Sequence, residues 1–264
     1  MTREAKLPRH AVILAAGLGT RLRPLTEQLP KPLVEVQGVA ILHNALRCLA
    51  GAGIRQATIV VGYRKETIIK SCGRVFAGVE ITYCESSVFD RTGSAYSLWL
   101  ARDSLQENAL ILEGDVFFEP AVLDQLLREE ADDVAAVSSF VAGMSGSAVT
   151  LSAWGYVAGI RMNQTMADIG DEPLFKTVNI FRFCGATLRE VLLPELDGLI
   201  GSGNTTAYVE QILKRIVDQG ALKLKTVNCD HLKWFEIDSE IDLRQAEIIF
   251  VSPPFAASVV AGQH

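Results

Sequence analysis

The most constraining feature of this 264-residue chain is the stretch from Ala11 to Val34, AVILAAGLGTRLRPLTEQLPKPLV, in which an apolar strand runs into a glycine turn. A strand that ends in such a turn exposes backbone N–H groups that can hold an anion. Arg21, Arg23 and Lys31 follow closely, and their positive charges can neutralise a polyphosphate. The stretch therefore predicts a nucleoside triphosphate site.

The glycine pattern argues against two common kinds of nucleotide site. The run from Gly17 to Leu22 reads G-x-G-x-x-L, so Leu22 stands where the dinucleotide fingerprint has its third glycine. No Gly-Lys dipeptide occurs in the chain, which excludes a Walker-type phosphate loop. An NAD-linked dehydrogenase is therefore the weakest hypothesis.

The composition of the chain limits the kinds of partner and the cellular compartment that we expect for it. The net charge of −6 argues against a general nucleic-acid binder, so clustered cations indicate local sites. No apolar run approaches the roughly 20 residues that span a bilayer, and the first residues lack a signal-peptide pattern. Five scattered cysteines without C-x-x-C spacing fit reduced thiols. We expect a cytoplasmic protein that binds neither nucleic acid nor membrane.

Strand-like and helical segments alternate through the first half of the chain. This alternation predicts an α/β fold with a Rossmann-like, mostly parallel mixed sheet flanked by helices. Ligands on such sheets bind beyond the carboxyl ends of the strands, where the glycine turn is expected. The expected strands are 10–16, 57–61, 79–84 and 109–112, and the expected helices are 41–52, 94–105 and 120–130.

The pattern changes after Asp133 and predicts a smaller antiparallel extension of the same sheet that covers the substrate. We expect one domain, 1–250, with a nucleotide-binding part over about 8–132, an acceptor-binding part over about 133–250, and a flexible tail, 251–264. The expected elements are a hairpin of strands 148–152 and 156–161, strands 174–183, 224–227 and 232–237, and helices 186–193, 205–219 and 240–250.

Two aspartates are candidates for metal binding. Asp115 ends an apolar run, and an acidic residue at the carboxyl edge of a parallel strand points into the ligand crevice. Asp238 follows another strand-like run, and Ser239 with Asp242 can cap the next helix, which leaves Asp238 free. Two carboxylates that converge on a triphosphate can hold Mg²⁺, the expected cofactor. The alternatives are a turn residue at Asp115 and a helix cap at Asp238.

The pattern G-x-G-T-R-L, with Pro24-Leu25-Thr26 and Pro30-Lys31-Pro32-Leu33 behind it, resembles the signature loop of nucleotidyltransferases that make NDP-sugars and CDP-alcohols. The resemblance covers about residues 10 to 250 and places metal-binding aspartates at Asp115 and Asp238. It implies that the nucleotide contacts Leu14, Ala15, Ala16, Gly17, Gly19, Thr20, Arg21, Lys31, Thr92 and Ser94.

A second distinctive segment is Lys176–Phe183, KTVNIFRF. A lysine inside an apolar strand is unfavourable unless it is paired, and an acceptor anion would pair it. The alternative is a lysine on an edge strand whose amine reaches water. The K-T-V-N-I-aromatic pattern resembles phosphocholine, phosphonate and polyol-phosphate cytidylyltransferases. That resemblance implies that Lys176 contacts a phosphate and that Asn179 shapes the acceptor site.

Other candidate contacts lie in two further segments. The run Thr92–Leu98, TGSAYSL, stands where the family contacts the nucleobase and is closer to the N-N-x-x-S-L form of the cytidylyltransferase branch, without its asparagines. Ser94 can instead cap the following helix. Aromatic and acidic groups for an ammonium-bearing acceptor come from Tyr208, Glu210, Trp234 and Glu236, with ordinary packing as the alternative for the aromatic residues.

These residues predict Mg²⁺-dependent transfer of a nucleotidyl group, and the resemblance to cytidylyltransferases implies transfer of CMP from CTP to phosphocholine, 2-aminoethylphosphonate or a similar acceptor. Pyrophosphate is released, and Arg21, Lys31 and Lys176 are the expected catalytic residues. A phosphate monoester has a second pKa of about 6 and arrives ionised, so no general base is needed. The alternatives are a sugar-1-phosphate uridylyl- or thymidylyltransferase and a non-catalytic nucleotide-binding regulator, and a homodimer is compatible with the sequence.

Overall fold

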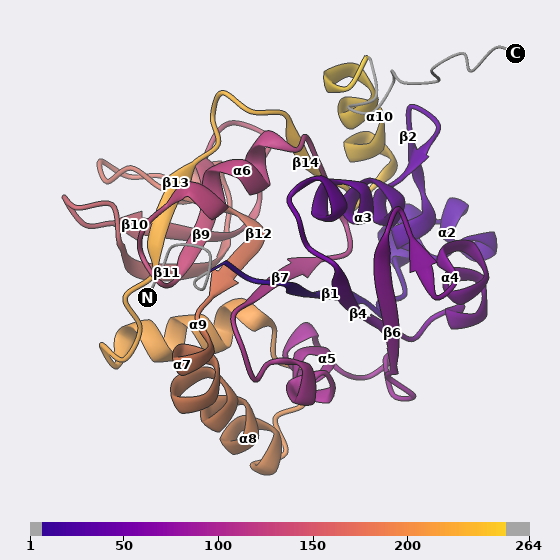
Figure 1. Ribbon diagram of the computed structural model, residues 1–264. Coiled ribbons are helices and arrows are strands. Elements are labelled where there is room, and N and C mark those ends of the chain that lie inside the picture. The colour runs from indigo at the N-terminus through magenta and orange to yellow at the C-terminus, as the bar shows by residue number, and fades with distance from the viewer. Residues whose placement is uncertain (1–6, 252–264) are drawn as a thin grey trace, which may run out of the picture.

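A central mixed sheet organises the computed structural model, which describes residues 7–251. In this described part, ten strands form the sheet, in the order β11-β10-β12-β7-β1-β4-β6-β5, with β9 beside β12 and β13 beside β9 (Figure 1). The strands are β1 (His10–Ala15), β4 (Gln56–Val61), β5 (Val75–Phe76), β6 (Val79–Glu85), β7 (Ala109–Glu113), β9 (Val134–Ser139), β10 (Gly146–Leu151), β11 (Val157–Gln164), β12 (Phe175–Phe183) and β13 (Lys225–Asn228).

The first half of the chain forms the parallel part of the sheet. β1 pairs in parallel with β4 and with β7, and β4 pairs in parallel with β6. The sequences of β1 and β4, HAVILA and QATIVV, are apolar and buried after their first residue, as strands covered on both faces require. The predicted α/β class with a mostly parallel mixed sheet is confirmed.

The antiparallel extension begins at β12. On one side this strand pairs antiparallel with β10 near its start and with β7 near its end, and on the other side it pairs antiparallel with β9. β10 and β11 form the expected hairpin. The extension also contains β9, which was not predicted, and β9 pairs in parallel with β13. One continuous sheet therefore joins the two parts of the chain.

Helices cover both faces of the sheet, because alternate residues of β1 enter different hydrophobic clusters. Ile13 packs in a cluster with α3 and α6, and Val12 packs in a cluster with α5 and α9 on the opposite face. The helices are α2 (Leu25–Gln28), α3 (Ile41–Gly51), α4 (Lys65–Cys72), α5 (Ser94–Leu100), α6 (Ala121–Arg128), α7 (Gly185–Thr187), α8 (Leu193–Gly201), α9 (Val209–Asp218) and α10 (Glu240–Ile249). The short 3-10 turns are η1 (Thr20–Leu22), η2 (Lys31–Leu33), η3 (Arg102–Ser104) and η4 (Met166–Asp168), and η5 (Leu188–Leu192) is a π turn.

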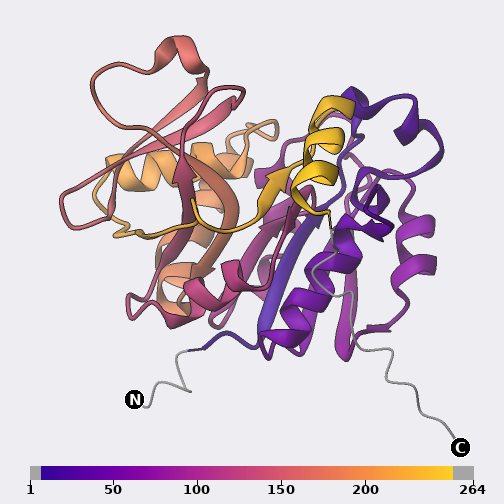
Figure 2. The ribbon, with the colours of Figure 1, turned by 90° about the horizontal axis from the view of Figure 1, so that it is seen from above.

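The end of the chain returns to the first half, as Figure 2 shows for the yellow helix α10. Here β14 (Trp234–Glu236) pairs antiparallel with β8 (Val116–Phe118), and Ile237 donates its backbone N–H to the carbonyl of Asp115 at 2.9 Å. α10 then lies near the small hairpin of β2 (Glu35–Val36) and β3 (Val39–Ala40). This return brings the segment that precedes α10 beside the end of β7.

Two further findings concern the predicted tail and membrane-spanning helices. The predicted flexible tail lies outside the described residues apart from Val251. In residues 7–251 no helix is both long enough and apolar enough to cross a membrane. The division into a nucleotide-binding and an acceptor-binding part stays a prediction.

We expect Phe117→Ala to lower the free energy of unfolding by about 3–5 kcal/mol, because it removes a large buried side chain and leaves a cavity. Phe117 is fully buried and its ring lies 4.7 Å from that of Phe250, so it holds α10 against the first half of the chain. Urea denaturation measures the change. Ile248→Ala, at an exposed position of α10, is the matched control and should stay within about 0.5 kcal/mol. A loss below about 1 kcal/mol for Phe117→Ala would contradict this account of α10.

Candidate active site

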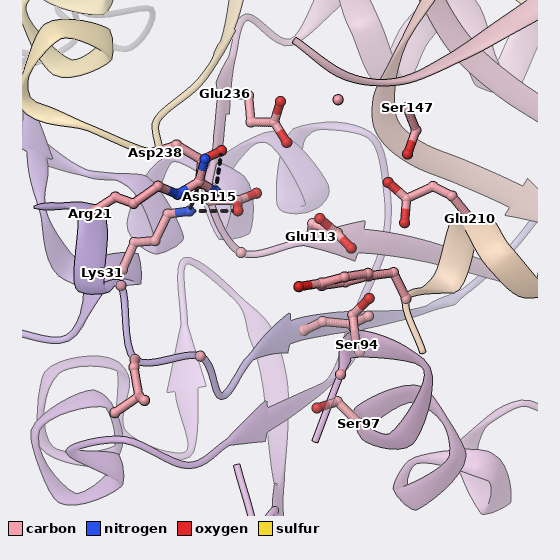
Figure 3. A pocket seen from close by; sticks show the side chains of 18 of the residues that line it. Arg21, Lys31, Ser94, Ser97, Glu113, Asp115, Ser147, Glu210, Glu236 and Asp238 are labelled. Atoms are coloured by element: carbon pink, nitrogen blue, oxygen red, sulfur yellow. Dashed lines mark hydrogen bonds and ion pairs between the residues drawn. The ribbon is translucent and has the colours of Figure 1, made fainter. Parts of the chain in front are cut away.

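A cavity of about 650 Å³ opens beyond the carboxyl ends of β1 and β7 (Figure 3). Both parts of the chain line it, because the parallel strands end at its floor and the hairpin of β10 and β11 stands at its side. The predicted residues that line it are Leu14, Ala15, Ala16, Gly17, Gly19, Thr20, Arg21, Lys31, Thr92, Ser94, Asp115, Lys176, Tyr208, Glu210 and Asp238. The structure therefore brings most of the predicted site together.

The glycine turn places Lys31 behind the end of β1. Gly19 has a φ of 62°, in the left-handed region that favours glycine, and a Cβ there would lie 2.8 Å from the Cβ of Lys31. Thr26 donates its hydroxyl to the Gly19 carbonyl at 2.7 Å and holds the turn. No described atom lies within 4 Å of the position that a Cβ on Gly17 would take, so a ligand can approach the backbone there.

Lys31 joins the two predicted metal-binding aspartates. Its Nζ lies 2.7 Å from Asp115 Oδ2 and 2.6 Å from Asp238 Oδ1. Arg21 Nη2 lies 2.8 Å from Asp238 Oδ2. Burial opposes the charge of Lys31, but attraction to the two carboxylates outweighs it and raises the pKa of the ammonium group. The predicted cations and carboxylates therefore form one paired cluster.

The cap of α10 keeps Asp238 available to this cluster. Ser239 accepts the backbone N–H of Asp242 and Asp242 accepts that of Ser239, which is the predicted capping box. Asp242 Oδ2 also accepts the backbone N–H of Asp238 at 3.1 Å. The alternative of Asp238 as the helix cap is therefore wrong, because Ser239 takes that role.

Two further carboxyl groups of the site are those of Glu113, which was missed from the sequence, and Glu236, which was expected only as an acid for the acceptor. Carboxylate oxygens of Glu113, Asp115 and Glu236 lie within 4.8 Å of one another. Burial raises the pKa of Glu236 to about 7, although its attraction to Lys176 opposes that shift, and burial with repulsion from Glu210 raises the pKa of Glu113. Each lies two residues before a predicted aspartate at a strand end, and this i, i+2 spacing is the signal that could have revealed them.

Lys176 and Asn179 hold these carboxylates. Lys176 Nζ lies 2.8 Å from Glu236 Oε2, and Asn179 Nδ2 lies 3.1 Å from Glu236 Oε1 and 3.4 Å from Glu113 Oε2. Lys176 is 4% exposed and pairs with Ala148 on one side and Ser138 on the other. The alternative of a lysine on an edge strand is therefore wrong, because β12 is an interior strand at this point. Asn179 does not line the cavity and acts from behind its wall.

The other predicted contacts take three different positions. Glu210, which is 8% exposed, lines the cavity and makes no hydrogen bond or ion pair to any residue in the described part of the chain. Tyr208 lies exposed at the cavity rim. Trp234 does not line the cavity, because its indole is buried in the core opposite Phe118 of β8. Of the two interpretations for Trp234, the structure supports packing and offers no acceptor contact.

The segment expected near the nucleobase is held by the start of α9. The Ser94 hydroxyl accepts the backbone N–H of Val209 at 3.0 Å and makes no cap bond to its own helix. Gly93 lies against the chain at residues 206 and 207, where a Cβ would come within 2.1 Å of the Ala207 carbonyl oxygen. Thr92 donates its hydroxyl to Val88 at 2.9 Å. The predicted cap role of Ser94 is wrong, since the hydroxyl links two helices.

The donor set of Asp115 and Asp238 fits Mg²⁺. Carboxylate oxygens are the ligands this ion prefers, and it binds through one or two carboxylates together with phosphate oxygens. Asp115 Oδ1 is buried and accepts no hydrogen bond from the described residues, so it can accept a cation. Glycine-turn amides, two cations and converging carboxylates are groups that could hold a triphosphate with a divalent metal.

Comparison with known proteins agrees with this site. Residues 10–166, more than half of the chain, match the family model described as Nucleotidyl transferase, so the chain belongs to the nucleotidyl transferase family. The solved structure of the CTP:phosphocholine cytidylyltransferase from Streptococcus pneumoniae has a TM-score of 0.76 at 23% identity. It covers 92% of this chain and 100% of that one, and at this identity the likeness concerns the fold.

Two curated relatives show how the similarity is distributed. The CMP-5'-(3-aminopropyl)phosphonate synthase of Streptomyces rubellomurinus is 34% identical over 249 residues, which cover 94% of this chain and 40% of that protein. The UTP–glucose-1-phosphate uridylyltransferase of Haloferax volcanii is 40% identical over 123 residues, which cover 47% of this chain and 50% of that protein. The chain thus spans half or less of the length of these relatives.

We expect Asp115→Asn to lower pyrophosphate release by at least about 10²-fold, because the amide loses the charge that a divalent ion needs. Turnover is measured by pyrophosphate release, and circular dichroism checks the fold. Asp124→Asn, at an exposed position of α6, is the matched control and should keep normal activity. Near-normal release by a folded Asp115→Asn variant would show that Asp115 is not a metal ligand.

Proposed function

We propose that this chain is a Mg²⁺-dependent cytidylyltransferase that transfers CMP from CTP to a small phosphonate or phosphorylated alcohol bearing an ammonium group, with release of pyrophosphate. The observation that carries the proposal is the division of one cavity into two charged sides. Lys31 and Arg21 lie with Asp115 and Asp238 on one side, and Lys176 lies among three glutamates on the other. The similarity to a CMP-5'-(3-aminopropyl)phosphonate synthase supports the same assignment.

The triphosphate is assigned to the glycine turn. The backbone from Gly17 to Thr20 would accept phosphate oxygens, and Arg21 and Lys31 would neutralise their charge. Asp115 and Asp238 would hold Mg²⁺, which would offset charge on the phosphates and on the departing pyrophosphate. Thr92 and Ser94 lie on the wall of the same cavity, in the segment expected to face the base.

The acceptor is assigned to the side of the cavity formed by β12 and α9. Lys176 is the cation available there for the acceptor anion. Three carboxyl groups, those of Glu113, Glu210 and Glu236, lie near this single ammonium group. Burial raises the pKa of Glu113 and Glu236, so a ligand that is itself cationic at its other end would favour their charged forms. Glu210, which has no described partner, is the best placed of the three to bind that ammonium group.

The chemistry needs no general base. A phosphate monoester is largely dianionic at neutral pH, so its oxygen can attack the α-phosphorus directly while the bond from that phosphorus to the bridging oxygen of pyrophosphate breaks. The task of the protein is to bring two anions together in line and to stabilise the charge of the leaving group. Lys31, Arg21 and Lys176 supply the necessary positive charge.

A second candidate is a sugar-1-phosphate uridylyl- or thymidylyltransferase. The 40% identity to a uridylyltransferase over 123 residues favours it. The two candidate functions differ in the acceptor, because a sugar 1-phosphate carries no cationic group that the three glutamates could bind. The three carboxyl groups near Lys176 therefore favour the aminated acceptor.

We expect a matrix of the four ribonucleoside triphosphates and dTTP against several acceptors to give pyrophosphate release with CTP and an aminated acceptor. The acceptors are 2-aminoethylphosphonate, 3-aminopropylphosphonate, phosphocholine, glucose 1-phosphate and a polyol phosphate. Release only with UTP or dTTP and glucose 1-phosphate would support the second candidate. Tight nucleotide binding without release on any acceptor would contradict both and favour a regulator.

We expect Glu210→Gln to raise KM for an aminated phosphonate by about 10-fold or more, because a charge-assisted hydrogen bond is weakened. The rate with propylphosphonate, which has no ammonium group, should change little. Steady-state kinetics with both acceptors measure the difference, and Glu190→Gln at an exposed position is the control. An equal loss on both acceptors would contradict the role of Glu210 in ammonium binding.

A further inference from the structure

We propose that Lys31 competes with the divalent metal for Asp115 and Asp238, and that a bound triphosphate resolves this competition by drawing Lys31 and Arg21 onto its phosphate oxygens. Metal and nucleotide would then bind cooperatively, because each removes an obstacle to the other. The inference rests on the proposed function only in requiring a nucleoside triphosphate as ligand.

The proposal is based on one cluster of ion pairs. The cations of this cluster are the groups that a triphosphate needs, and its carboxylates are the groups that a metal needs. Lys31 Nζ takes Asp115 Oδ2 and Asp238 Oδ1, at 2.7 Å and 2.6 Å, and Arg21 takes Asp238 Oδ2 at 2.8 Å. Three of the four carboxylate oxygens are therefore paired with protein cations. The fourth, Asp115 Oδ1, is buried and accepts no hydrogen bond within the described part of the chain.

Lys31 and Arg21 differ in how strongly they compete with the metal for the carboxylates. The Lys31 side chain is largely buried between both aspartates, so it lies in the position where a bridging cation is needed. The Arg21 side chain is 69% exposed and contacts only Asp238 of the two. An exposed ion pair contributes little, whereas removing one partner from a buried pair leaves an uncompensated charge. Lys31 is therefore the main competitor.

The arrangement predicts how each ligand binds alone. A metal that binds both aspartates without nucleotide must displace the Lys31 ammonium from between them, and the ammonium then loses both of its ion-pair partners. A triphosphate that enters without metal must take Lys31 and Arg21 from two carboxylates that are then left unpaired beside phosphate. When both enter, the phosphates take the cations and the carboxylates take the metal. The resulting coupling must be equal in both directions.

Titration with Mn²⁺ alone, followed by electron paramagnetic resonance, tests the proposal. We expect Lys31→Met to bind Mn²⁺ without nucleotide about 10-fold more tightly than the parent protein, and Lys31→Arg, which keeps the charge, to bind it as weakly as the parent. With a non-hydrolysable CTP analogue present, the parent should gain more Mn²⁺ affinity than Lys31→Met does. The first titration contains neither nucleotide nor acceptor, so its result is independent of whether the chain transfers CMP.

Arg21→Met is the matched control for loss of one positive charge, and its Mn²⁺ affinity should rise by less than about 3-fold. A rise as large as that of Lys31→Met would overturn the proposal, because general charge would then explain both. No tightening in Lys31→Met would also overturn it.

A reciprocal measurement covers the case in which Lys31→Met does not fold. Asp238→Asn should bind CTP more tightly than the parent in the presence of EDTA, because Lys31 and Arg21 lose a shared competitor. Glu240→Gln, two residues away and outside the cluster, controls for the lost negative charge and should bind as the parent does. Equal or weaker CTP binding by Asp238→Asn would overturn the proposal.

Discussion

The ion pairs of Lys31 with Asp115 and Asp238 are the contact on which the site depends. They join residues that are 84 and 207 positions apart in the sequence, so they unite the glycine turn, the end of β7 and the segment before α10. Burial disfavours each of these charges alone, and pairing offsets that penalty. The three segments must therefore come together for any of the charges to be well placed. The pairing of β14 with β8 and the backbone hydrogen bond from Ile237 to Asp115 place the segment before α10 beside the end of β7.

A second buried pair, Lys176 with Glu236, organises the opposite side of the cavity. Its setting differs because Glu113 and Glu210 add further carboxyl groups, while Asn179 donates to two of the carboxyl groups from behind the wall. The first cluster has as many cations as carboxyl groups, and the second has one cation for three carboxyl groups. A ligand that is anionic at one end and cationic at the other matches that distribution. The two pairs thus give one cavity two chemically distinct ends.

Several elements followed directly from local pattern. β1 and β4 are continuous apolar runs, α3 ends next to Gly53 as its periodicity predicted, and the capping box at Ser239 was readable from two residues. β9 was missed although all but its last residue are buried, because its strand role depends on pairing with β12. The expected helix 94–105 ends at Leu100, and a 3-10 turn follows it. These differences arise where contacts with neighbouring elements of the fold, and not the local sequence pattern, determine the backbone conformation.

The sequence by itself determined the glycine turn, the two aspartates, the cations behind the turn and the alternation that makes a parallel sheet. Each of these is a local pattern whose chemistry does not depend on distant residues. Only the tertiary structure decided that Lys176 is interior, that Trp234 belongs to the core, and that Glu113 and Glu236 join the site. It also decided that Lys31 pairs with both aspartates. The physical reason is that burial and ion pairing depend on which strands lie side by side in the fold. The residues that pair are far apart in the sequence, so local sequence pattern does not encode their contact.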